Sequence, residues 1–452
     1  METFVAAIST FALACLVLQY SVNGESFVLA YPRMVYHYMS PTVHAISGGH
    51  GGTMDIFVPD DDSVISVNVS NEYTHYFPDD IVTTSGTENK TVIISSLDDI
   101  HVYGIAGWSM FTPISVMSLG TKYMLSFCTS ISSGTNTHSY IFIIASHKDQ
   151  ANIEIEWRAA GTIMYNGATY VSGDVLRVAL APYQTFTLRN DADMTGTTIT
   201  SLTGTIAVFN GGESFTRHSK LPYLTSYDQL PPLDWDGTEF VFLSMHYHQN
   251  EVTTITVTAN EDTSISFNNG STVVIDDKQF YREDIFTERM FQLKTDSPAM
   301  VTLCYHEDFT FQYGYESLFV APPVNAYIQH TAFRRDHVNV IAEKADVHRV
   351  AVHDANHNNL NVSWRDVAYT NYVFGAVEKG PSQVFITSDR TFTAFAVGPD
   401  FGRNGGYNFT YTNATGKSNV HYHAIHEYRN MFISHRLSQV LQFMFFSKIN
   451  IL

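Results

Sequence analysis

The chain has 452 residues, of which 44% are hydrophobic and only 15% charged. This composition excludes a disordered polypeptide and allows two to four ordinary domains with sizeable cores. Lys and Arg number 25 against 44 Asp and Glu, which gives a formal net charge of -19. Because nucleic acids and anionic membranes bind basic surfaces, this acidic balance argues against either as the main partner.

An apolar run opens the chain over residues 4–18. Its length is typical of the hydrophobic region of a signal peptide and falls short of the roughly 20 residues of a membrane-spanning helix. Small residues precede Glu25, so we expect residues 1–24 to be a signal peptide, although basic residues before the run are absent. The alternative is a buried N-terminal strand. No later apolar stretch reaches spanning length, and the sequence therefore predicts a secreted, extracellular protein without a membrane span.

Acceptor sites for N-glycosylation agree with such a location. The pattern Asn-x-Ser/Thr occurs at Asn68, Asn89, Asn269, Asn361, Asn408 and Asn413, and Pro is never the middle residue. Six sites exceed the chance number only modestly, so they support the signal peptide and predict a glycoprotein.

Cysteine is rare. Cys15 would leave with the signal peptide, and Cys128 and Cys304 would remain in strand-like segments. In an oxidising compartment these two either form a disulfide, which would close a long loop and contribute on the order of 4 kcal/mol, or stay as buried thiols in separate modules. The sequence leaves both possibilities open.

Short alternating apolar runs recur from residue 25 to residue 398, and no helical apolar period is sustained. The sequence therefore predicts an all-β fold. A pair of strands also recurs, with the second strand entered through Ser95, Ser201, Thr295 and Ser388, at intervals of 106, 94 and 93 residues. This period suits a β-sandwich of about 100 residues better than a propeller blade of roughly 40 to 50. We expect about four tandem β-sandwich-like modules, with a β-propeller-like arrangement as the alternative.

The repeat gives expected boundaries. An N-terminal β module would span residues 25–117, and three further modules would lie near residues 118–226, 227–325 and 326–400. In the first module we take Ile65–Val67 as the counterpart of the earlier strand of each pair. Residues 401–452 have no counterpart in the repeat and form a divergent tail.

Short motifs with a strong catalytic or phosphate-binding meaning are missing. We therefore expect no enzyme activity, no cofactor, and no catalytic or metal-binding residues. His246 and His248, the histidines at 421–426, and the acidic groups at 60–62 and 234–236 have some metal-ligand character, but exposed or solvated side chains explain them more simply. The tryptophans, Trp108, Trp157, Trp235 and Trp364, would either form a sugar-stacking surface or fill the core, which is commoner.

Several segments share their order and spacing with one known family. They are Ser118–Tyr123, Ser139–Ala145, Ala151–Ile155, Leu180–Leu188, Asp193–Thr197, Ile206–Gly211 and, most distinctively, Asp228–Val241 with its Leu-Pro-Pro and Gly-Thr-Glu-Phe runs. Over residues 118–400 the chain resembles the N-terminal domain of the IgGFc-binding protein family. Two departures stand out, because Glu213–Phe215 replaces a segment in which relatives often carry a cysteine, and cysteine-rich mucin-type modules are absent.

The resemblance implies a secreted binding or adhesion protein of mucus or body fluid, with a place in innate immunity. Its partner would be an extracellular glycoprotein or cell-surface protein, among which an immunoglobulin Fc-like domain is one candidate. The alternatives are a lectin-like carbohydrate binder, a structural component of a mucus or matrix gel, and a glycan-directed hydrolase. The residues that bind the ligand and the oligomeric state stay open.

Overall fold

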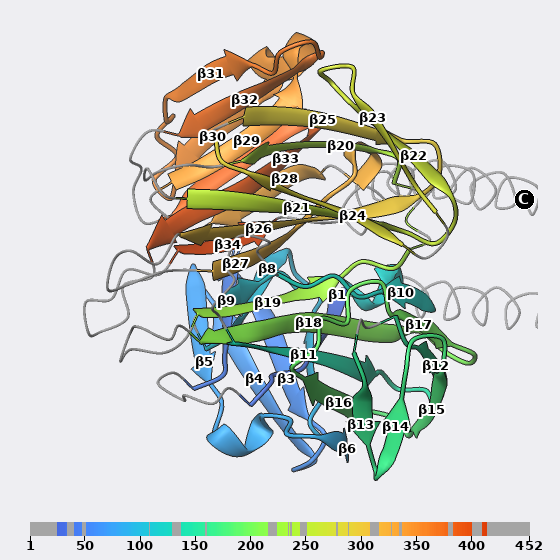
Figure 1. Ribbon diagram of the computed structural model, residues 1–452. Coiled ribbons are helices and arrows are strands. Elements are labelled where there is room, and N and C mark those ends of the chain that lie inside the picture. Colours follow the sequence, from blue (N-terminus) through green and yellow to red (C-terminus); the bar gives the residue numbers. More distant parts are fainter. Residues whose placement is uncertain are drawn as a thin grey trace, which may run out of the picture.

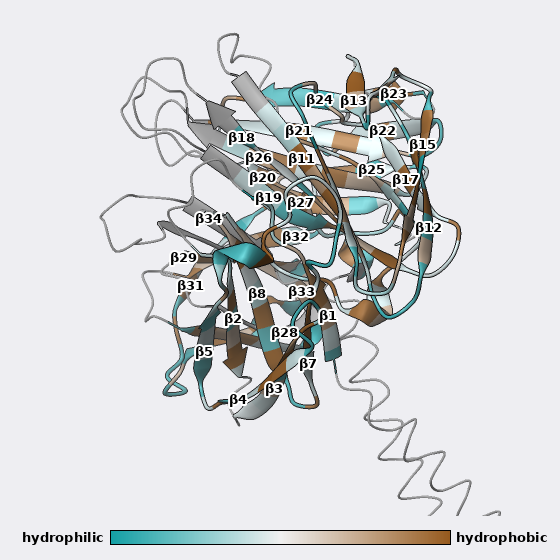
Figure 2. Ribbon diagram, turned by 90° about the horizontal axis from the view of Figure 1, so that it is seen from below, coloured by the Kyte–Doolittle hydropathy of each residue, from teal (hydrophilic) through white to brown (hydrophobic). Residues whose placement is uncertain are grey.

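The computed structural model describes residues 25–33, 40–47, 51–107, 109–128, 137–158, 161–215, 224–233, 235, 237–244, 251–276, 279–287, 289–307, 316–326, 328–333, 337–377, 383–399 and 409–413. Strands make up nearly all of its regular structure (Figure 1), so the all-β prediction is confirmed. The few helical turns are η1 (Asp79–Ile81), η2 (Val116–Ser118), η3 (Val324–Ala326) and η4 (Lys344–Arg349). Apolar and polar residues alternate along many strands (Figure 2), as expected where one face of each sheet is buried.

Residues 25–111 form two antiparallel sheets, called here the first pair. One sheet has the order β1 (Glu25–Leu29), β7 (Val92–Ser96), β3 (Gly52–Val58) and β4 (Ser63–Val69). The other has the order β5 (Glu72–Tyr76), β2 (Thr42–Ser47), β8 (Ile100–Ala106) and β9 (Ser109–Phe111). Their facing apolar side chains, such as Val43 and Ile56, form a common core.

Residues 122–230 form the second pair. One sheet runs β10 (Lys122–Met124), β17 (Thr198–Ser201), β12 (Ala151–Glu156) and β15 (Val175–Leu180). The other runs β19 (Leu224–Leu230), β18 (Ile206–Phe215), β11 (Thr137–Ser146), β16 (Thr185–Asn190) and β6 (Gly86–Glu88), so β6 is contributed by an earlier part of the chain. A small hairpin, β13 (Ile163–Tyr165) and β14 (Ala168–Tyr170), turns at Asn166 and Gly167, both of which have the positive φ that a tight Asn-Gly turn requires.

Residues 239–321 form the third pair. One sheet has the order β20 (Glu239–Ser244), β25 (Arg289–Thr295), β22 (Thr263–Phe267) and β23 (Thr272–Ile275). The other has the order β24 (Phe280–Ile285), β21 (Glu251–Ala259), β26 (Ala299–Glu307) and β27 (Glu316–Ala321). Residues 328–413 make one fourth sheet, in the order β28 (Ile328–Phe333), β33 (Val384–Pro399), β29 (His337–Glu343), β32 (Tyr372–Val377) and β31 (Val362–Asp366). Two more strands, β30 (Ala351–Asp354) and β34 (Phe409–Asn413), also pair with β33.

The fourth sheet is covered on both faces by the rest of the molecule. Val340 on one face belongs to a core cluster with Ile46 and Tyr103 of the first pair. Phe395 on the other face lies 5.6 Å, ring centre to ring centre, from Phe319 of the third pair. Most members of the Val340 cluster belong to β29, β30, β32 and β33 themselves, so the fourth sheet buries apolar residues against its own strands as well as against its neighbours.

Four strands meet at the centre of the molecule. They are β9, β19, β27 and β34, and each pairs with one described strand of its own sheet. Across sheets, β19 contacts β9 and β27, while β34 contacts the same two strands, so the contacts form a closed ring (Figure 1). The last strand of each of the four units thus lies beside the last strands of two others.

A recurring hydrogen bond marks the repeat. In each of the three pairs, a side chain that follows the second repeated strand accepts a backbone N–H from the strand beside it. The bonds are Thr53 N to Asp98 Oδ2 at 2.7 Å, Asn152 N to Thr203 Oγ1 at 3.1 Å, and Ser264 N to Asp296 Oδ1 at 2.7 Å. This contact gives a physical reason for the polar residue at the end of each repeated strand.

One predicted equivalence within the repeat is wrong. Ile65–Val67, expected to match the earlier strand of the other pairs, lies in β4, which pairs with β3 alone among the described strands. It is β3 that pairs with β7, through Asp55 opposite Ser95. The corresponding partners are Ile153 opposite Ser201 and Ile265 opposite Thr295. Alternation alone could not separate two neighbouring strands of similar composition.

Candidate functional site

The junction between the first and second pairs is built around β19, which opens the distinctive segment Asp228–Val241. The backbone N–H of Tyr227 donates to Ser109 Oγ at 3.0 Å, and that hydroxyl donates back to the Tyr227 carbonyl at 3.1 Å. The Tyr227 hydroxyl donates to the Ala30 carbonyl at 2.8 Å. Gln229 Oε1 accepts the backbone N–H of Ile114 at 2.8 Å. Tyr227 and Gln229 of β19 therefore both hydrogen-bond to residues that precede the second pair in sequence.

Two glycines allow β19 to lie where it does. Gly211 and Gly212 of β18 stand opposite Tyr227 and Ser226 in the strand pairing. A Cβ atom on Gly211 would lie 1.9 Å from the Ser226 carbonyl oxygen, a distance that no side chain tolerates. The close approach of these backbones therefore requires glycine.

Asp228 lies between the second and third pairs. Its Oδ1 accepts the N–H of Gln229 at 2.8 Å, and its Oδ2 accepts the N–H of Val320 in β27 at 3.4 Å. Although the residue as a whole keeps some exposure, protein atoms surround its carboxyl group. The loss of hydration raises the pKa of this carboxyl to about 8, and the two backbone hydrogen bonds oppose that shift only in part.

A small cavity adjoins Asp228. Its volume is about 20 Å³, and its walls include Thr112, Gln229, Trp235 and Pro323. This is close to the space that one buried water molecule occupies, so neither a sugar ring nor a partner's side chain fits there.

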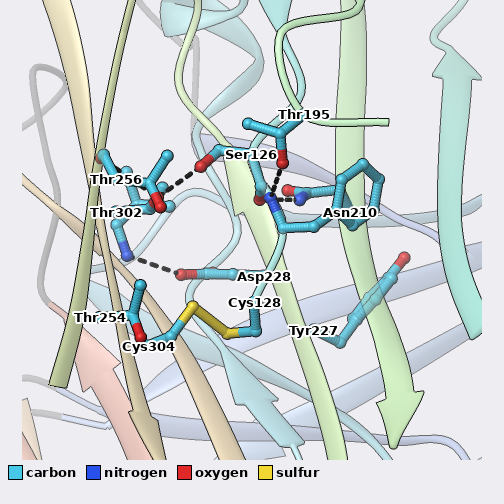
Figure 3. Close-up of a disulfide and its surroundings, with 12 residues drawn as sticks. Ser126, Cys128, Thr195, Asn210, Tyr227, Asp228, Thr254, Thr256, Thr302 and Cys304 are labelled. Atoms are coloured by element: carbon cyan, nitrogen blue, oxygen red, sulfur yellow. Dashed lines mark hydrogen bonds between the residues drawn. A yellow bond between two sulfur atoms is a disulfide. The ribbon is translucent and has the colours of Figure 1, made fainter. Parts of the chain in front are cut away.

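The second and third pairs are joined covalently beside this carboxyl (Figure 3). Cys128 and Cys304 form a disulfide with a Cα–Cα distance of 5.4 Å, although 176 residues separate them in sequence. Around it the layer is polar, since Ser126 Oγ and Thr302 Oγ1 hydrogen-bond at 2.5 Å and Asn210 Nδ2 donates to the Ser126 carbonyl. Further buried threonines on this face of the third pair are Thr254, Thr256 and Thr258.

Arg282 of β24 adds an ionic contact to the same interface. Its guanidinium lies 2.8 Å from Asp193 Oδ2, and it donates to Thr195 Oγ1 at 3.0 Å and to the Phe127 carbonyl at 3.3 Å. The Arg282 side chain is only 10% exposed, so solvent screens this ion pair weakly. Arg282 has no sequence signal that distinguishes it from other charged residues of alternating strands, whereas Asp228 is the first residue of the distinctive segment Asp228–Val241.

The glycosylation sequons are spread over the surface and converge on no site. Asn68, Asn89, Asn269 and Asn361 are all exposed. Asn408 lies outside the described residues, and Asn413 is the last residue of β34.

Among the weaker candidates, those with described side chains do not come together either. Asp60 accepts a hydrogen bond from Lys90 Nζ at 2.7 Å in an exposed turn. Trp157 is fully buried and Trp235 nearly so, with its indole N–H donating to the Ser118 carbonyl at 3.2 Å. Trp364 packs over Gly375. His246, His248, Trp108, Asp234, Asp236 and the tail histidines at 421–426 lie outside the described residues.

Two general features complete the description. Among the residues described, no three His, Cys, Asp or Glu side chains are grouped so that they would hold a metal ion. Within the same ranges, no helix has both the length and the hydrophobicity that crossing a bilayer demands.

Comparison with known proteins gives one family. A family model described as IgGFc binding protein matches residues 107–398, well over half of the chain. The human IgGFc-binding protein is 25% identical over 155 residues, which is 34% of this chain and only 3% of the human protein. This chain therefore matches a small part of that relative.

Among solved structures, the major pilin of Streptococcus pyogenes aligns over 65% of this chain and 98% of its own, with 11% identity and a TM-score of 0.14. A bacterial ice-binding adhesin aligns over 64% of this chain and 93% of its own, with 11% identity and a TM-score of 0.10. Scores this low establish no shared fold.

Proposed function

Because the chain belongs to the IgGFc-binding protein family, we propose that it is a secreted, non-catalytic protein that binds an extracellular glycoprotein or a cell-surface protein. The family match over residues 107–398 is the observation that carries this proposal. An Fc-like domain is one candidate partner, since the human relative is named for binding immunoglobulin Fc. Mucus or body fluid is the proposed setting.

Two features support an extracellular location. The Cys128–Cys304 disulfide needs an oxidising compartment to form and persist. The four sequon asparagines with described side chains are all exposed, as acceptors of N-glycans must be. The apolar run at residues 4–18 agrees with entry into the secretory pathway.

The junction geometry favours binding over catalysis. Asp228 has the raised pKa that a general acid would need, but the cavity beside it holds about one water molecule. A glycan-directed hydrolase requires a cleft that admits a sugar ring between two carboxyl groups. Burial of Trp157 and Trp235 likewise removes two of the aromatic side chains that a lectin site would use.

The test is capture by the full chain produced in secretory animal cells. The purified protein is immobilised and exposed to mucus or body fluid of the source organism, and in parallel to purified immunoglobulin Fc, with bound proteins identified by mass spectrometry. We expect a glycoprotein or cell-surface protein that binds saturably and is displaced by free chain. Enzymatic removal of the partner's glycans separates the two binding modes, because a lectin loses such a partner and a protein-binding surface keeps it.

Two variants make the result interpretable. Gly211→Ala should abolish capture because β19 can no longer pair with β18, whereas Gly161→Ala, which meets only the Ala192 methyl at 3.1 Å, should leave it intact. Recovery of the chain alone, with no other protein retained, would overturn the proposal in favour of a self-associating structural component.

A further inference from the structure

The four sequons with described side chains share a position in the fold. Each lies on a strand at the outer end of a sheet, directly next to one, or in a turn that leads to one. Asn68 lies in β4, Asn89 follows β6, Asn269 lies in the turn before β23, and Asn361 precedes β31. In their respective sheets, β4, β6, β23 and β31 are terminal strands, each paired on one side only within the described chain.

Uncovered terminal strands promote aggregation. Their free N–H and C=O groups can pair with a strand of another molecule, and exposed β-branched residues favour that pairing. On β4, Val64 and Ile65 are 61% and 37% exposed, and Val274 of β23 is 69% exposed. The edges of β4 and β23 therefore combine free backbone groups with exposed apolar side chains.

Several terminal strands without a sequon are covered by other segments or carry a charge. In the ring at the centre of the molecule, β19 lies against both β9 and β27. A bridge between Phe27 and Ser115 covers β1, and one between Phe240 and Pro323 covers β20. The free edge of β15 carries Arg177, with a side chain 74% exposed, and a charge on an edge also opposes strand addition.

From this distribution we infer that N-glycans on Asn68, Asn89, Asn269 and Asn361 shield the free edges of β4, β6, β23 and β31. A bulky hydrated glycan beside an edge strand excludes a second strand sterically while leaving the sheet intact. The shielding rests on the proposed secretion, because only a chain that enters the secretory pathway acquires these glycans. It concerns self-association and not the partner surface.

The experiment compares three forms of the full chain made in secretory animal cells. Site occupancy is measured by mass spectrometry of glycopeptides, and assembly is measured by light scattering after size exclusion. The fourfold Asn68→Gln, Asn89→Gln, Asn269→Gln and Asn361→Gln variant should form large aggregates at concentrations where the wild type keeps one discrete size. Wild type treated with an endoglycosidase after folding should do the same, which excludes a defect confined to folding.

A matched control distinguishes edge shielding from added solubility. Adding Glu261→Asn to the fourfold variant creates a sequon with Thr263 in the exposed turn between β21 and β22, two inner strands. This glycan should not prevent aggregation, whereas restoring Asn68 alone should reduce it at least twofold. Equal rescue by both, unoccupied sites in the secreted wild type, or a fourfold variant of unchanged size would each overturn the inference. Failure of the chain to be secreted would instead contradict the proposed function.

Discussion

Arg282 and Asp193 form an ion pair of 2.8 Å between two sheet pairs, across 89 positions of sequence. The arginine lies on β24, and the aspartate lies in the turn before β17, where Asp193 Oδ1 also accepts the N–H of Thr195 at 2.9 Å. The second and third pairs are therefore held in one orientation by a pair of charges as well as by the disulfide.

Replacing Arg282 with alanine should destabilise the protein by roughly 2 to 4 kcal/mol, because Asp193 would keep a partly buried charge without its arginine. Arg177→Ala is the matched control. Its ion pair with Glu154 is exposed, and its loss should cost less than about 0.5 kcal/mol. Urea unfolding of the two variants measures the difference, and similar midpoints would contradict the assigned role.

Asp228 should make stability depend on pH. The folded pKa of about 8 lies above the ordinary aspartate pKa of 3.8, so the unfolded chain releases this proton at lower pH than the folded chain does. The contribution of Asp228 to the free energy of unfolding should therefore fall as pH rises from about 4 to about 8, and level off above that.

Asp228→Asn isolates this effect because the amide keeps the shape and does not titrate. The difference in unfolding free energy between variant and wild type should grow in favour of the variant from pH 5 to pH 8. A difference that is constant over this range, measured by urea unfolding at several pH values, would show that the carboxyl is hydrated in the folded protein.

The disulfide should contribute on the order of 4 kcal/mol through the long loop it closes. The Cys128→Ser/Cys304→Ser double variant should unfold at lower temperature than the wild type by calorimetry, and reduction of the wild type should lower its midpoint similarly. Non-reducing peptide mapping provides the direct check, and free thiols at both positions in the secreted protein would contradict the pairing.

Gly211→Ala should be among the most damaging single changes, at roughly 3 kcal/mol or more, because the added methyl meets backbone and not a movable side chain. Gly161→Ala should cost about 1 kcal/mol, since the 3.1 Å contact with the Ala192 methyl group needs only a slight displacement of that segment. Thermal unfolding of the two variants compares them, and equal midpoints would mean that β18 and β19 can separate without loss.

The sequence predicted the all-β class and the family because both depend on local alternation and on short runs such as Leu230–Pro232. The covering of the fourth sheet by its neighbours was not predictable in this way. Val340 and Ile341 look like any alternating apolar pair, and only long-range packing shows that they face different units. The same limit applies to Asp228, whose pKa is set by atoms far away in sequence. The module boundaries at 118, 227 and 326 stay a prediction.

The ring of β9, β19, β27 and β34 has a consequence for how the molecule comes apart. In a linear array of repeats, one unit can unfold while the rest persist, because each repeat contacts only its neighbours in sequence. Here β34, the last strand of the described chain, touches a strand from the first quarter of the chain, so none of the four described units is terminal. Unfolding any one of the four units removes contacts from two others. The whole molecule should therefore unfold in a single cooperative step.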